Sequence, residues 1–63
     1  MNKTIKRLKI LNNLLEIRRL GIENELKRAV LLKEWSKVAG YDGIEIGLII
    51  AKKIIENEIK LNE

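Results

Sequence analysis

The chain has 63 residues and a formal net charge of +4; 46% of its residues are apolar and only 3% are aromatic. A chain of this length forms one domain, and folding removes only about 60% of its unfolded surface from water. Cysteine and histidine are both absent, so disulfide bonds and zinc sites built on these residues are excluded. Oligomerisation is therefore the expected source of additional stability.

The composition favours helices. Proline is absent, and lysine, arginine, glutamate, leucine and isoleucine dominate, which is typical of long helices rather than of strands and turns. With one tryptophan and one tyrosine, the core must be built from aliphatic side chains, which suit packed helices. The sequence therefore predicts an all-α fold in one domain, residues 1–63.

The first predicted helix covers about residues 3–38. An apolar stripe recurs along it at three-, four- and seven-residue spacing and continues through Gly21. Glycine inside a helix costs about 1 kcal/mol relative to alanine, so a bend or break at Gly21 is an alternative, and a break would give a three-helix monomer. The stripe consists of Leu8, Leu11, Leu15, Ile22, Leu26 and Ala29.

The predicted turn covers residues 39–43. In Gly40-Tyr41-Asp42-Gly43, Asp42 can cap the following helix with Glu45 three residues later, and Gly40 suits the left-handed end of the preceding helix. The second helix then covers about residues 43–61. At 1.5 Å per residue the two arms would be about 50 and 30 Å long. The apolar face of the second helix consists of Ile44, Leu48, Ala51, Ile54, Ile55 and Leu61.

The first helix carries a second apolar set away from the first stripe. Two apolar faces imply two neighbours, and a cyclic dimer is the commonest way for identical chains to cover such surface. The prediction is a helix-turn-helix hairpin that dimerises into an antiparallel four-helix bundle. Gly43, Gly47 and Ala51, spaced four apart, would allow another helix to approach closely. The second apolar set consists of Ile10, Leu14, Ile17, Leu31, Trp35 and Val38.

Catalytic residues are scarce. One serine, Ser36, has no acid–base partner nearby in sequence and is interpreted as an exposed helical residue. Glu56 with Glu58, or Glu23 with Glu25, would make poor metal ligands, because residues two apart on a helix point about 200° from each other. We therefore predict no enzyme activity, no catalytic residue, no cofactor and no metal site.

Three charged residues, Arg18, Glu25 and Glu58, fall within or beside the apolar stripes. Polar groups in such positions need partners. The favoured interpretation is a buried or half-buried ion-pair layer that fixes the pairing of the helices. An enzyme would become plausible only if the three residues converged around a cavity large enough for a small molecule.

Positive charge is concentrated in the first half of the chain. Residues 1–28 contain eight basic and three acidic side chains, a net charge of +5, while residues 29–63 contain five and six, a net charge of −1. The predicted function is an adaptor that binds an unidentified protein; the alternative is salt-sensitive nucleic-acid binding through the basic first helix, although aromatic residues for base stacking are nearly absent. Residues predicted to contact a partner are Arg18, Arg19, Lys27, Arg28, Trp35 and Tyr41.

No membrane partner is expected. The longest apolar run, residues 47–51, is far below membrane-spanning length, no signal peptide is visible, and glutamates interrupt the polar faces. The absence of cysteine fits a cytoplasmic protein. Abundant lysine, glutamate and isoleucine favour a hot environment, whereas six asparagines oppose it.

In length and layout the whole chain resembles the small helical-hairpin protein of archaeal spindle-shaped viruses, the fuselloviruses. The resemblance rests on the absence of cysteine, the basic start at residues 1–7, the turn sequence Gly40-Tyr41-Asp42-Gly43 and the isoleucine-rich residues 44–59. It implies a dimeric four-helix bundle and an adaptor role in the cytoplasm of a thermophilic host. In hairpin plan the chain is also similar to the plasmid-encoded regulator of primer, which binds paired RNA loops; this likeness is architectural.

Overall fold

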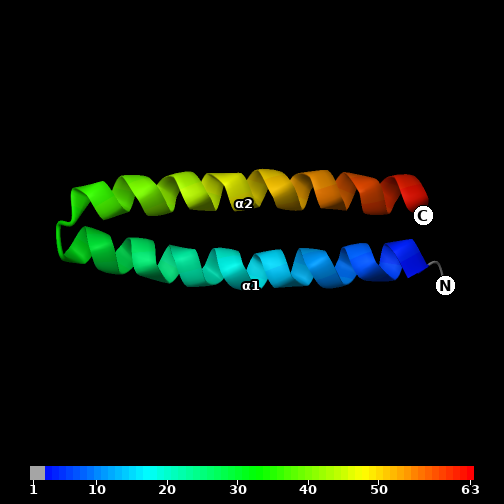
Figure 1. Cartoon of the computed structure of the whole chain (residues 1–63), viewed down its shortest axis with the longest axis horizontal. Coiled ribbons are helices and arrows are strands. Elements are labelled where there is room, and N and C mark those ends of the chain that lie inside the picture. Colours follow the sequence, from blue (N-terminus) through cyan, green and yellow to red (C-terminus); the bar gives the residue numbers. More distant parts are fainter. Residues whose placement is uncertain (1–2) are drawn as a thin grey trace.

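The computed structural model describes residues 3–63, which form two antiparallel helices, α1 (Lys3–Leu31) and α2 (Trp35–Asn62) (Figure 1). The helices lie side by side along their whole lengths, and the hairpin measures 47 × 14 × 10 Å. The start of α1 and the end of α2 lie at the same end of the molecule, opposite the turn (Figure 1). The prediction of an all-helical hairpin is confirmed for these residues.

The predicted position of the turn is wrong. Residues 39–43 lie inside α2, and the chain reverses at residues 32–34 instead. The arms are therefore nearly equal, with 29 residues in α1 and 28 in α2, and the short second arm is wrong as well. Gly40 has no positive φ, and α1 continues through Gly21 without a break.

Backbone hydrogen bonds explain where α1 ends. The amide of Glu34 donates to the carbonyl of Ala29 at 2.9 Å, and the amide of Lys33 donates to that of Val30 at 3.1 Å. This six-to-one and five-to-two pattern is a Schellman motif, which requires a left-handed residue just after the helix. Lys33 takes that conformation with φ 56°, although glycine is the residue that usually does so. The turn is thus made without glycine.

A heptad seam joins the two helices. Side chains spaced alternately three and four residues apart are less exposed than their neighbours, which is the pattern of an antiparallel coiled coil. Because the turn is centred near Lys33, residues equally distant from it lie at similar heights along the hairpin. The seam consists of Ile5, Leu8, Asn12, Leu15, Arg19, Ile22, Leu26 and Ala29 in α1, and of Val38, Tyr41, Glu45, Leu48, Lys52, Ile55 and Ile59 in α2.

The seam does not make a closed core. Ala29, with 4% of its surface exposed, is the one buried residue among those that the structure describes. The radius of gyration is 14.5 Å, against about 10.6 Å for a compact domain of this length. Large aliphatic side chains along both helices therefore remain in contact with water.

We predict that Lys33→Gly raises the free energy of unfolding by about 1 kcal/mol, because it removes the left-handed strain of a residue with a Cβ. Lys53→Gly, at an exposed position inside α2, is the matched control and should lower it by about 1 kcal/mol. The measurement is urea unfolding followed by circular dichroism at one fixed chain concentration. Equal destabilisation by both substitutions would contradict the observed turn.

Candidate interaction surfaces

Cross-helix ion pairs occupy one flank of the seam, which we call the ion-paired side. Three pairs join the helices there, Lys9 with Glu63 at 3.6 Å, Arg19 with Glu45 at 3.9 Å, and Lys52 with Glu16. Lys9, Glu16 and Glu23 recur every seven residues and therefore lie on the same flank of α1. The ion-paired side holds the hairpin closed by charge as well as by apolar contact.

Arg19 and Glu16 are the centre of this network. The Arg19 guanidinium donates to Glu16 Oε1 from Nη2 at 2.6 Å, and to Glu23 Oε2 from Nη1 at 3.1 Å. Hydrogen bonds from Arg19 and Lys52 hold the pKa of the Glu16 carboxyl well below its usual range, at about 2. The same hydrogen bond with Glu16 raises the pKa of Arg19. Glu16 is therefore a carboxylate that stays ionised to low pH.

The predicted ion-pair layer exists, but other residues form it. Arg18, Glu25 and Glu58 are exposed, and within residues 3–63 none of them makes an ion pair. Glu25 lines the cavity beside the turn, whereas Arg18 and Glu58 are not among the residues that line it. Arg19, the neighbour of Arg18, lies in the seam instead, because it falls seven residues after Asn12 and seven before Leu26.

The opposite flank of the hairpin, which we call the apolar side, is different in chemistry. Its central part carries one charged residue, Arg18, between aliphatic side chains and glycines. The cross-helix ion pairs of the described chain all lie on the other flank. The central part consists of Leu11, Leu14, Arg18 and Gly21 from α1, and of Ile44, Gly47, Ala51 and Ile54 from α2.

Residues predicted to pack the core divide between the seam and the apolar side. Leu11, Ile44 and Ile54 face outward, with at least 45% of each side chain exposed. They lie outside the seam between α1 and α2, and their predicted role in a dimer stays a prediction. Those that lie in or beside the seam are Leu8, Leu15, Ile22, Leu26, Ala29, Leu48, Ala51 and Ile55.

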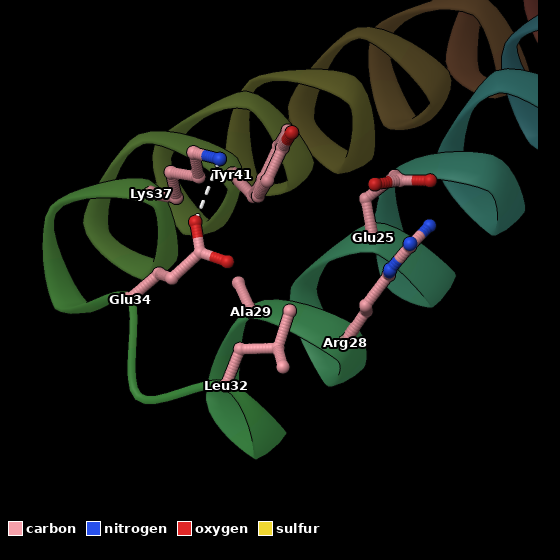
Figure 2. Close-up of a pocket in the computed structure, with 7 residues that line it drawn as sticks. All are labelled: Glu25, Arg28, Ala29, Leu32, Glu34, Lys37 and Tyr41. Atoms are coloured by element: carbon pink, nitrogen blue, oxygen red, sulfur yellow. Dashed lines mark ion pairs between the residues drawn. The ribbon is translucent and has the colours of Figure 1, made fainter.

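A shallow cavity of about 230 Å³ lies beside the turn (Figure 2). Lys37 and Glu34 form an ion pair of 2.6 Å at its edge, which raises the pKa of Lys37. Figure 2 shows Tyr41 from α2 and Arg28 from α1 on its opposite walls. Its volume is below the usual range of small-molecule sites, about 300–1,000 Å³. Its lining residues are Glu25, Arg28, Ala29, Leu32, Glu34, Lys37 and Tyr41.

Residues predicted to contact a partner do not form one patch. Arg19 is engaged within the hairpin, and Lys27 pairs with Glu23 at 3.6 Å. Trp35 begins α2 with 62% of its surface exposed, outside the cavity that Arg28 and Tyr41 line. Arg18 lies on the apolar side, about two helical turns from that cavity.

Within residues 3–63, no cluster of three or more acidic side chains is arranged to hold a metal ion. Neither helix of that part of the chain is long and apolar enough to cross a membrane. No protein-family profile, no curated protein and no solved structure matches this chain.

The low pKa of Glu16 predicts loss of stability in acid. A carboxyl whose pKa is lower in the folded state stabilises that state above its ordinary pKa, near 4.5, and this contribution is lost as the pH falls toward about 2. Urea unfolding at pH 5 and pH 2.5 should therefore show a smaller decrease in stability for Glu16→Gln than for the unchanged protein. Glu56→Gln removes an exposed carboxyl that makes no ion pair within residues 3–63; it is the control and should behave like the unchanged protein. Identical acid sensitivity in all three proteins would contradict the network.

Proposed function

We propose that the chain works as a non-enzymatic, homodimeric helical bundle that binds another protein as an adaptor. The observation that carries the proposal is the apolar surface that the hairpin leaves in water. Residues as large as Ile17 and Ile50 expose more than half of their surface. Such surface on a small chain indicates association with another molecule.

The size of this surface supports a dimer. A compact monomer of 7.3 kDa would expose roughly 4,200 Å². The hairpin exposes 5009 Å², an excess of about 800 Å². One partner in a standard protein–protein interface contributes about 800 Å². Pairing two hairpins over such an interface would therefore bring the exposed surface per chain to about that of a compact monomer of the same mass.

The positions of the basic residues favour a protein partner over phosphates. A continuous basic face would suit nucleic acid, whereas basic residues scattered among glutamates suit protein contacts. Arg19, Lys27 and Lys52 are already paired with glutamates. Lys9 and Lys37 also pair with acidic residues, and most of the other basic residues lie toward the two ends of the hairpin, with Glu16 and Glu23 between them. They are Lys3, Lys6, Arg7 and Lys60 at the end opposite the turn, and Arg28 and Lys33 near the turn; Arg18 and Lys53 lie between these groups and apart from them.

Nucleic-acid binding is the second candidate. The observation in its favour is the basic group at the start of α1, where Lys6 and Arg7 are exposed and make no ion pair within residues 3–63. Such a group would bind phosphates without reading sequence, and the affinity would fall steeply with salt.

The proposed setting follows the resemblance to the hairpin protein of archaeal spindle-shaped viruses. In that setting the bundle would join viral and host proteins in the cytoplasm of a thermophilic cell. The hairpin architecture of residues 3–63 is compatible with this role, and the proposal needs no catalytic group.

Sedimentation equilibrium tests both candidates together. The purified chain is measured alone and with a short DNA or RNA duplex, at low and at moderate salt. We expect twice the chain mass of 7.3 kDa, unchanged by the duplex. A monomer at all concentrations would overturn the homodimer. Binding to the duplex that weakens with salt would replace the adaptor by the nucleic-acid candidate.

A further inference from the structure

We infer that a second copy of the chain packs on the apolar side, antiparallel to the first, about a two-fold axis that passes near Gly21 and Gly47. The inference deepens the proposed homodimer and rests on it. The ion-paired side is closed by its own charges, whereas the apolar side exposes Leu14 and Ile54 at more than half of their surface. Of the two flanks, the apolar side gains more from leaving water.

Two charges of α1 on this side, Arg18 and Glu25, are complementary to each other. Arg18 and Glu25 are seven residues apart and therefore project on the same flank, and Gly21 lies between them. Neither makes an ion pair within the described hairpin. When α1 packs antiparallel on a second α1 with the axis near Gly21, Arg18 of each copy meets Glu25 of the other. Two unpaired charges per chain become two ion pairs per dimer.

The apolar-side face of α2 is also complementary to the same face of a second copy. Ile44 and Ala51 are seven residues apart on either side of Gly47. About an axis near Gly47, Ile44 of each copy lies against Ala51 of the other, so that a large side chain meets a small one. Farther from the axis, Lys37 of each copy would lie against Glu58 of the other. Because Gly21 and Gly47 are at similar distances from the turn, a single axis serves both helices.

The direction of the axis follows from the same charges. A two-fold axis perpendicular to the helices places α1 against α1 and α2 against α2. An axis parallel to the helices would place α1 against α2 of the second copy. Arg18 and Glu25 would then lie against Ala51 and Ile44 without a partner of opposite charge. The perpendicular axis is therefore the one that satisfies the charges.

The glycines agree with a close approach of this kind. A Cβ added at Gly21 or Gly47 would meet nothing within 4 Å inside the hairpin, and neither residue has a positive φ. Each nonetheless costs about 1 kcal/mol of helix stability relative to alanine. The hairpin alone gives no reason for them, whereas a second helix crossing at these positions does.

A matched pair of substitutions tests which side is covered. Leu14, on the apolar side, has 57% of its surface exposed, and Leu20, beside the ion-paired side, has 48%. We expect Leu14→Lys to weaken dimerisation by more than tenfold in sedimentation equilibrium, because it would bury a positive charge in the interface close to Arg28 of the second copy. Leu20→Lys should change it by less than a factor of three. Circular dichroism at matched concentration verifies that both variants remain helical.

Charge reversal tests the axis. Arg18→Glu and Glu25→Arg should each weaken dimerisation by about tenfold, because each places like charges together twice in the dimer. The double variant exchanges the two signs and should restore the affinity to within about threefold. A two-fold axis parallel to the helices would keep Arg18 and Glu25 of the two copies apart, so it predicts no restoration of affinity in the double variant.

Disulfide trapping gives an independent readout, since the chain has no cysteine of its own. Gly21→Cys should form a disulfide-linked dimer on mild oxidation, and Leu20→Cys should not. If the unchanged protein is dimeric but Leu20→Lys dissociates it and Leu14→Lys does not, the inferred face is wrong while the proposed homodimer stands. Failure of both the charge exchange and the Gly21→Cys disulfide would overturn the axis. A monomeric unchanged protein would overturn the homodimer and the interface together.

Discussion

The seam between α1 and α2 is the interaction on which the rest of the structure depends. It uses one stripe of each helix and leaves the other faces of both helices in water, because two helices can cover each other on one side only. Ala29 alone is buried among the described residues, close to the turn where the backbone joins the two helices. Aliphatic side chains also occupy many positions of both helices outside the seam. The hairpin is therefore a folded unit with an incomplete core.

The seam itself is partly polar, and this limits its contribution to stability while fixing its register. Arg19, Glu45 and Lys52 replace apolar residues at three of its positions, and Asn12 at a fourth. The Asn12 side-chain oxygen has no hydrogen-bond partner among residues 3–63, which costs about 1–3 kcal/mol. Polar groups in a coiled-coil seam specify register at the expense of stability. Arg19 pairs with Glu45, and Lys52 with Glu16, when α1 and α2 pair as observed, so a slipped hairpin would lose these cross-helix ion pairs as well as apolar contact.

The sequence predicted the helices and most of the seam, but it misplaced the turn, for identifiable reasons. Gly40 and Gly43 suggested a reversal, yet a glycine can also lie on an outer helix face, as both do here. The true reversal uses Lys33 in a left-handed conformation, which residue type alone does not indicate. A signal was present in the heptad pattern. If the three- and four-residue spacing of α1 continued beyond Ala29, it would place the polar residues Lys33 and Ser36 in the seam. The apolar spacing starts again, in a new register, at Val38, which indicates an interruption between Ala29 and Val38. The same register distinguishes Arg19 in the seam from Arg18 outside it. What lies against the outer faces cannot be read from one chain, because the pattern shows which residues are apolar and not what covers them.

The two flanks of the hairpin have separate roles in the proposed assembly. The ion-paired side makes its cross-helix ion pairs within the chain, whereas Arg18 and Glu25 on the apolar side are complementary to the same residues of a second copy. A dimer on the apolar side would not cover every outer residue. Ile46 and Ile49, near the ion-paired flank, would stay exposed, as would Ile10 and Ile17 on the back of α1. In the proposed adaptor these residues occur twice, on opposite faces of a two-fold symmetric bundle. A bundle of this kind presents two equivalent apolar surfaces and can therefore join two copies of the same partner.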